Sequence, residues 1–243
     1  MTSGGTPTMT DSKSCLLPEH IEKVRTRDGG AHSVTDLEAG KTALVIVDMQ
    51  NFYMKEGATS YCPHAQAVVP NVNRLADAVR RFGSPVIWLR NIANAENFKT
   101  WSHHYERMTQ ARIDIRKREL AKDGEGFRYW HEMDVRETDR KVEKARYSAF
   151  IPGTSNLERI LSEYGVDTLI LCGVATNVCV ESTARDAMML NYRTLIVEDA
   201  CAANSIDAHE TSLNTLYLNF GDVQTTDEVL DNLGMDKAIE AAE

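Results

Sequence analysis

The sequence predicts an α/β protein, a three-layer α/β/α sandwich built around a mostly parallel central sheet. Short apolar runs that are typical of buried strands alternate along the chain with helical patterns. A parallel sheet with crossover helices requires this alternation. Reactive polar residues also follow two of the apolar runs, at the strand ends where open parallel sheets bind their ligands.

The first strand is expected at Ala43–Asp48, where apolar residues run without a charge until the aspartate. A helix is expected near Pro70–Phe82, because a proline stands in its first turn and Gly83 lies just past its end. The second strand is expected at Pro85–Arg90. These elements begin the alternation of strand and helix.

The stretch 98–132 gives the weakest secondary-structure signal. It contains several aromatic residues and the charged run 112–118. We expect a solvated helix followed by a loop rather than an anion site, since runs of charge are usually exposed faces. The aromatic residues leave a further interpretation open, a lid or a subunit contact that closes a pocket.

The second half of the chain returns to a regular alternation. A helix is expected at Asn156–Tyr164, closed by Gly165, and a buried strand at Thr168–Cys172. The remaining elements are a helix over Glu181–Tyr192, a strand at Arg193–Glu198, a helix near Asp207–Asn219 and a short strand at Asp222–Thr225.

The composition fits one domain of 243 residues, preceded by a polar arm. Hydrophobic residues make up 42% of the chain, which is enough for a full core over 37–243. Residues 1–36 are polar, and we expect an arm that is mobile or that orders only against another subunit.

Charge and cysteine content exclude several classes of function. The formal net charge of −9 argues against a nucleic-acid or anionic membrane partner. The chain has no apolar run of membrane-spanning length, and its N-terminus lacks an apolar signal core. Five cysteines without close CxxC spacing fit reduced thiols, so we expect a cytoplasmic protein.

Cys179 is the strongest candidate for a catalytic residue. It stands in the first turn of a predicted helix, just past the end of a predicted strand. The partial positive charge of a helix N-terminus favours a thiolate, and its free N–H groups can hold an oxyanion. The alternative is a small buried residue that packs the helix on the sheet.

Asp48 and Lys144 are the candidate partners of Cys179. Asp48 ends the first predicted strand, so its carboxylate is expected in the same crevice as the thiol, where it can act as a general base. An Asp that caps a strand end is the alternative. A lysine beside both groups stabilises their anions, although most lysines are surface charges.

Three segments in order resemble the isochorismatase-like cysteine hydrolases. They are Leu44–Asn51, Lys144–Phe150 and Cys172–Thr183, and the resemblance spans residues 40–230. It implies a Rossmann-like hydrolase domain over 37–243, an Asp48–Lys144–Cys179 catalytic triad, and a homo-oligomer. It also implies a cis peptide bond between Val174 and Ala175, beside an oxyanion donor at Ala175.

The resemblance implies hydrolysis of a small carbon–nitrogen amide through a thioester, which releases ammonia or an amine. The wording of the motifs is closest to ureidoacrylate, N-carbamoylsarcosine and biuret amidohydrolases, so a ureido or carbamoyl substrate is expected. Two alternatives stay open, an isochorismatase-type vinyl ether hydrolase and a catalytically idle scaffold or binding relative. Cys179 argues for amide chemistry, because isochorismatases proper generally do without this nucleophile.

No metal or other cofactor is expected. Nicotinamidases of this family carry an Asp-x-His pair and a further His as metal ligands. Between residues 49 and 84 this chain has one histidine, His64, and one aspartate, Asp77, which lies in a predicted helix.

Further substrate contacts are expected near the carboxyl ends of the first two strands. Gln50 would face the same side as Asp48, and its amide could bind a ureido group or belong to a turn. Asn91 and Trp88 lie at the end of the second strand, where Trp88 is expected to pack in the core rather than line the pocket.

Overall fold

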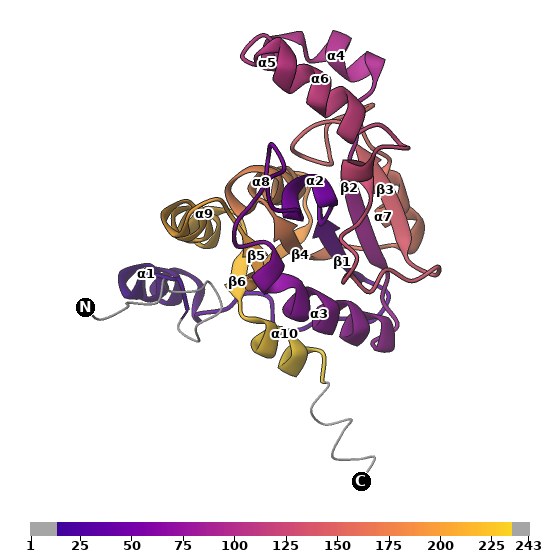
Figure 1. The fold of residues 1–243 in the computed structure, drawn as a ribbon. Helices are drawn as coiled ribbons and strands as arrows, with labels where there is room; N and C mark the ends of the chain where they lie inside the picture. Colours follow the sequence, from indigo (N-terminus) through magenta and orange to yellow (C-terminus); the bar gives the residue numbers. More distant parts are fainter. Residues whose placement is uncertain (1–13, 235–243) are drawn as a thin grey trace, which may run out of the picture.

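A computed structural model of the chain describes residues 14–234. Six parallel strands form one sheet in the order β3-β2-β1-β4-β5-β6 (Figure 1). Their bounds are Thr42–Val47 (β1), Val86–Asn91 (β2), Arg140–Lys144 (β3), Thr168–Val174 (β4), Arg193–Ala202 (β5) and Asp222–Gln224 (β6). The predicted parallel sheet is therefore confirmed.

Helices cover the sheet on both faces. One layer contains α3 (Val69–Arg81), which packs on β1 and β2, and α10 (Thr226–Asn232), which packs on α3. The other contains α8 (Glu181–Met189) and α9 (Ile206–Asn219), which contact each other and β5, and α7 (Leu157–Tyr164), which links β3 to β4. Right-handed crossovers that run in opposite directions along the sheet place the two sets on opposite faces. This is the predicted three-layer sandwich.

The order of the strands places a switch point between β1 and β4. From β1 the chain moves outward to β2 and β3, and it then returns to β4 on the other side of β1. The connections that leave β1 and β4 therefore diverge to opposite faces and open a crevice at the carboxyl ends of these strands. Asp48 and the segment before Cys179 follow those two strands directly.

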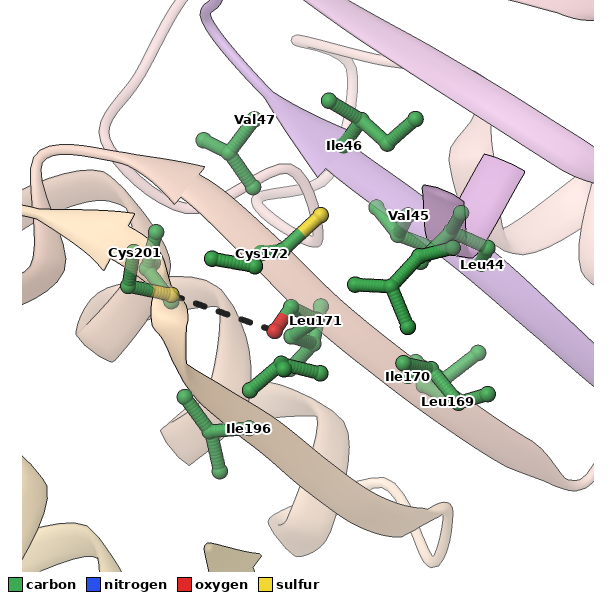
Figure 2. Packing of buried hydrophobic residues seen from close by; sticks show 14 of the residues in the cluster. Leu44, Val45, Ile46, Val47, Leu169, Ile170, Leu171, Cys172, Ile196 and Cys201 are labelled. Carbon is green, nitrogen blue, oxygen red and sulfur yellow. Dashed lines mark hydrogen bonds between the residues drawn. The ribbon is translucent and has the colours of Figure 1, made fainter. Parts of the chain in front are cut away.

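The two central strands are buried along their whole length. Every residue of β1 and β4 is buried, and Figure 2 shows their side chains packed with Ile196 and Cys201 of β5. Cys172 is 0% exposed, as expected for a core residue. Gly173 allows β4 to approach β1 closely, because a Cβ atom there would overlap the Val47 carbonyl oxygen.

The sequence analysis missed β3, the edge strand that carries Lys144. Four of its five residues are charged, and only Val142 and Lys144 are buried. Charged side chains are common on edge strands, where they discourage pairing with another chain. The strand therefore shows no apolar run by which it could be identified.

The described part of the N-terminal arm packs on its own chain, which corrects, for residues 14–36, the expectation of an arm that is mobile or orders only against another subunit. Within the described part of the arm, residues 14–36, α1 (Pro18–Asp28) contacts α9. The Leu17 N–H donates to Asn214 Oδ1 at 2.9 Å, and the Ser33 N–H donates to Asp222 Oδ2 at 2.8 Å. Residues 1–13 of the predicted arm lie outside the described residues. The assembly state stays a prediction.

Three short helices follow β2 and stand apart from the sheet (Figure 1). They are α4 (Ala95–Thr100), α5 (Ser102–Tyr105) and α6 (Gln110–Glu119), and we call residues 95–119 the helical cap. The predicted solvated helix over the charged run corresponds to α6, although Arg116 within it is buried. Two other short elements lie near the crevice, α2 (Asn51–Met54) and η2 (Glu125–Phe127); η1 (Gln66–Val68) precedes α3.

Among residues 14–234, no helix has both the length and the apolar character needed to cross a membrane.

Candidate active site

Three neighbouring strands deliver the polar groups of the crevice. Asp48 follows β1 with a φ of 53°, a left-handed conformation that turns the chain sharply at the strand end. Asn91 and Lys144 are the last residues of β2 and β3, and they are partners in the parallel register of these strands. Because the carboxyl ends of parallel strands share one edge of the sheet, the three side chains converge.

Asp48 and Lys144 form a buried ion pair. Lys144 Nζ lies 2.7 Å from Asp48 Oδ2, and both side chains are 0% exposed. The ammonium also donates to the Arg146 carbonyl at 3.1 Å. Burial alone would lower the pKa of Lys144, but the negative charge of Asp48 and hydrogen bonds to Asp48 and Cys179 raise it above its usual value. Lys144 therefore stays charged and keeps a carboxylate beside it.

Burial has the opposite effect on Asp48. It raises the pKa of this carboxyl above the ordinary value, and the charge of Lys144 partly offsets the rise. Hydrogen bonds from Lys144, the Cys179 thiol and the Asn91 N–H also oppose the rise.

Cys179 lies in η3 (Thr176–Val180), a π-helical turn that runs directly into α8. The residue is therefore at a helix start beyond β4, as the sequence predicted, and is 5% exposed. The expected shift toward the thiolate is wrong. Burial raises the pKa of Cys179 to about 12; the charge of Lys144 opposes this rise, and that of Asp48 adds to it. The thiol is protonated at neutral pH and needs a base.

The backbone before Cys179 has the features that the family resemblance implied. The Val174–Ala175 peptide bond is cis. The Ala175 carbonyl accepts from the N–H groups of Val178 (3.0 Å) and Val180 (3.2 Å), which flank Cys179 in the chain. The Cys179 N–H, which lies between them, does not donate to the Ala175 carbonyl.

Thr183 fixes the nucleophile turn from the following helix. Its hydroxyl donates to the Cys179 carbonyl at 2.7 Å and accepts from the Ala149 N–H at 3.3 Å. It thereby joins the Cys179 turn to the segment that follows Lys144. The sequence analysis missed this role, although Thr183 lies four residues after Cys179, the spacing at which helical side chains reach back to a carbonyl.

The residues that were expected to contact the substrate have different roles in the structure. Gln50 Nε2 donates to the carbonyls of Asn91 and Phe127, both at 3.1 Å, and its Oε1 accepts from the Asn91 N–H at 2.7 Å. No amide donor is left for a ligand, so Gln50 holds the walls around Asp48. Trp88 is 0% exposed and donates its indole N–H to Asp139 at 2.8 Å, which is the core position that the sequence favoured.

Asn91 remains beside the candidate catalytic groups, and two tyrosines that the sequence analysis did not single out join it. The Asn91 amide donates to the Tyr53 hydroxyl at 2.8 Å. Burial, followed by the Asp48 charge, raises the pKa of Tyr53 well above its usual value. Burial, followed by the Cys179 charge, also raises the pKa of Tyr147. Tyr53 lies in α2, which has only four residues and so gives no periodic signal.

The donor set for a metal is incomplete. Asp77 pairs at the surface with Arg81 (2.9 Å) and Arg136 (3.0 Å). In the part of the chain that the structure describes, no group of three or more His, Cys, Asp and Glu side chains is arranged to hold a metal ion. Independence from metal stays a prediction.

Comparisons with known proteins agree with this geometry. Residues 42–228 match the isochorismatase domain. The isochorismatase family protein YecD of Escherichia coli O157:H7 is 33% identical over 201 residues, 82% of this chain and 99% of that protein. The ureidoacrylate amidohydrolase RutB of Acinetobacter baylyi is 32% identical over 202 residues, 76% of this chain and 81% of that protein.

A solved structure shows the same fold. The crystal structure of a cysteine hydrolase from Pseudomonas syringae pv. phaseolicola 1448A superposes with a TM-score of 0.74 at 27% identity. The match covers 82% of this chain and 95% of that chain. The chain described here therefore belongs to the isochorismatase-like cysteine hydrolase family of hydrolytic enzymes.

Proposed function

We propose that this protein hydrolyses a small linear amide of the ureido or carbamoyl type through a thioester on Cys179. One observation carries the proposal, the fully buried Asp48–Lys144 ion pair beside a thiol at the switch point of the sheet. A buried ion pair is a weak source of stability, because the two charges lose their hydration. A role in catalysis accounts for its place beside a nucleophile.

Asp48 acts first as the general base. The pKa of Cys179 is raised to about 12, so the thiol reacts only when a base takes its proton during the attack. Asp48, which is hydrogen-bonded to the Cys179 thiol, takes the proton, and the sulfur forms a bond to the carbonyl carbon of the substrate. The carbonyl π electrons move to the oxygen, which becomes an oxyanion.

The backbone N–H groups of Ala175 and Cys179 bind this oxyanion. Ala175 precedes the turn and Cys179 lies within it, and the Ala175 carbonyl accepts hydrogen bonds from the N–H groups of Val178 and Val180. One such donor contributes about 3–4 kcal/mol to the transition state in other hydrolases. Lys144 offsets the negative charge that passes between the sulfur, Asp48 and the oxyanion.

Asp48 acts next as the general acid. It returns the proton to the substrate nitrogen as the carbon–nitrogen bond breaks, and ammonia or an amine leaves. A water molecule then gives a proton to Asp48 and attacks the thioester carbonyl. The carbon–sulfur bond breaks, and the thiol recovers its proton from Asp48.

The sequence relatives support the choice of substrate. The Acinetobacter baylyi relative is named ureidoacrylate amidohydrolase, and it aligns along 76% of this chain. The protein groups around Cys179 supply a base, an acid and oxyanion donors, so each step above proceeds with residues of this chain alone.

A substrate panel tests the proposal. We expect ammonia or amine release from ureidoacrylate, biuret or N-carbamoyl amino acids, and no turnover of nicotinamide or isochorismate. Mass spectrometry of rapidly quenched enzyme should find the acyl group on the peptide that contains Cys179. Dialysis against a chelator should leave turnover unchanged. Turnover of isochorismate without any amide hydrolysis would contradict the proposal.

A further inference from the structure

His209 is a buried histidine whose ring contacts the nucleophile turn from the neighbouring helix, α9. Its Nδ1 atom forms a 2.8 Å hydrogen bond with the hydroxyl of Thr176, which is the first residue of η3. Thr176 is itself 0% exposed, so solvent cannot replace His209 as the partner of this hydroxyl. The contact therefore joins α9 to the start of the turn that contains Cys179.

The chemistry of His209 suits it to this hydrogen bond rather than to proton transfer. Burial lowers the pKa of His209 to about 4, so its ring is neutral at neutral pH. A neutral imidazole has one donor and one acceptor nitrogen, and either can pair with a hydroxyl. The other ring nitrogen, Nε2, is buried without a partner among residues 14–234. Such an atom is destabilising, so a phenyl ring would suit the core better if packing were the only role of this residue.

Ser212 adds a second contact from the same helix. It lies three residues after His209, so the two side chains share one face of α9. Its hydroxyl donates to Glu181 Oε2 at 2.6 Å and to the Thr176 carbonyl at 3.4 Å. Thr176 begins η3, and Glu181 follows it as the first residue of α8. Helix α9 thus holds residues at both ends of the turn.

The position of Thr176 affects the direction in which the proposed oxyanion donors point. Thr176 follows Ala175 directly, and the backbone hydrogen bonds of the turn close on the Ala175 carbonyl. A movement of Thr176 therefore reorients the N–H groups of Ala175 and Cys179. Thr183 fixes the Cys179 carbonyl, near the other end of the turn, and its hydroxyl does not bind Thr176.

We propose that His209 is a positioning residue: through the Thr176 hydroxyl, it holds the backbone N–H groups of Ala175 and Cys179 in the orientation that binds the oxyanion. The inference rests on the proposed function and names the side chain that keeps its donors in place. His209 acts without contact to the substrate and without moving a proton. A misplacement of about 1 Å can lower a rate by about 100-fold, so loss of this one contact should slow turnover strongly.

Two substitutions remove the hydrogen bond while they largely keep the shape of the side chains. Thr176→Val and His209→Phe should each lower kcat for an amide substrate by about 30- to 100-fold, with KM changed less than about threefold, because the donors stabilise the transition state. The double variant should be no slower than the slower single variant, since both remove the same bond. Unchanged kcat in the two single variants would overturn the inference.

Two conservative substitutions provide the rescue. Thr176→Ser keeps the hydroxyl, and the amide of His209→Asn can take the place of Nδ1. Both variants should keep kcat within about fivefold of the wild-type value. A loss in Thr176→Ser as large as that in Thr176→Val would assign the effect to packing and reject the positioning role.

Alkylation of Cys179 by iodoacetamide separates a positioning role from a general disturbance of the site. This reaction displaces iodide from a saturated carbon and forms no oxyanion, so it needs the thiol and its base but not the backbone donors. The alkylation rate of Thr176→Val should stay within about threefold of the wild-type rate while kcat falls. Parallel losses of alkylation and turnover would sink the inference.

Asn214→Leu is the matched control on the same helix. Asn214 is buried like His209, but it accepts from the Leu17 N–H of the N-terminal arm at 2.9 Å. Its loss should lower the urea midpoint of unfolding and leave kcat within about twofold of the wild-type value. A fall in kcat as large as that of His209→Phe would show that any damage to α9 slows the enzyme, which would reject a specific role for His209.

Amide hydrogen exchange tests the contact without any substrate. In His209→Phe, the N–H groups of residues 175–180 should exchange about tenfold faster or more, relative to those of β1. Faster exchange in a protein that hydrolyses no amide would retain the role of His209 in holding the turn and reject the proposed function. Amide hydrolysis with a normal kcat in His209→Phe would do the reverse.

Discussion

Asp48 and Lys144 stand at the ends of strands of the sheet, whereas Arg116 and His104 stand on short helices apart from the sheet. The first two side chains are 0% exposed and are held by the register of β1, β2 and β3. The cap depends mainly on stacked rings: those of Trp101 and His104 lie 3.9 Å apart, centre to centre. We call the candidate catalytic groups Asp48, Lys144 and Cys179 the floor of the site.

This contrast indicates a division of labour between reaction and selection. The floor holds the groups that the proposed reaction needs, and its backbone is fixed by the sheet. The cap lies apart from these groups and carries charged and aromatic side chains. Substitutions in the floor should therefore affect all substrates alike, and substitutions in the cap should change the ranking of substrates.

The largest effect is expected at the nucleophile. Cys179→Ala should lower kcat/KM at least about 10³-fold for every amide, because no other group can form the thioester. Cys179→Ser should be nearly as inactive, since Asp48 is a weak base for a hydroxyl. Urea unfolding should show a loss of about 1 kcal/mol or less, because alanine fits the turn. An active Cys179→Ala enzyme would show that the reaction does not proceed through the floor.

The ion pair is expected to show a smaller but coupled effect. Lys144→Met leaves the Asp48 carboxylate buried without a cation, so it should destabilise the fold by about 3–5 kcal/mol as well as slow turnover. The double variant Asp48→Asn/Lys144→Met removes both charges and should regain much of that stability without regaining activity. Urea midpoints and kcat/KM for the four proteins form the cycle. Additive losses of stability would contradict a coupled pair.

The floor was largely predictable from the sequence because its signals are local. Asp48 ends an uninterrupted apolar strand, and Cys179 follows another, so parallel topology alone places both at one crevice. Lys144 was a candidate on chemical grounds, but no strand pattern placed it at the crevice, since its strand consists mostly of charged residues. The predicted acidic thiol was wrong because burial, which no local pattern reveals, outweighs the positive charges near Cys179.

The cap was not predictable for the opposite reason. Arg116 lies in a run of charges that looks like an exposed face, and most of that face is exposed. Only the tertiary contacts with Phe52 and Tyr105 bury this one side chain. Gln50 is the opposite case. Its spacing from Asp48 suggested a substrate contact, but three hydrogen bonds to backbone groups, which the sequence does not reveal, give it a positioning role.

A substitution of Trp101 tests whether the cap selects rather than reacts. Its ring packs on His104, lies 5.1 Å from the Tyr147 ring, and is covered by Arg146 at 4.9 Å. Trp101→Ala should loosen the cap and raise KM for N-carbamoyl-β-alanine about tenfold, with kcat changed less than threefold. A fall in kcat alone would place Trp101 with the floor.

The smallest expected effect is the response to acid of two histidines, His209 behind the floor and His104 in the cap. Burial lowers the pKa of His209 to about 4, and burial with the nearby arginines lowers that of His104 to about 4. His209 is 1% exposed and hydrogen-bonds Thr176 at 2.8 Å in the nucleophile turn. Above pH 6.5 neither ring is charged in the folded or the unfolded state. As the pH falls below 6.5, the unfolded chain binds protons first, so stability decreases.

The two histidines should respond to acid differently, because His209 is in the core and His104 is on an element that can open alone. As the pH falls from 7.5 to 5, the titration of His209 should lower the free energy of unfolding by about 2 kcal/mol. Protonation of His104 should instead speed amide hydrogen exchange in residues 98–116 over the same pH range, before the amides of the sheet exchange. His104→Phe keeps a ring that stacks on Trp101 but binds no proton, so it should abolish the acid response of the cap and leave the global one. Identical responses in cap and sheet would show that the two regions open as one unit.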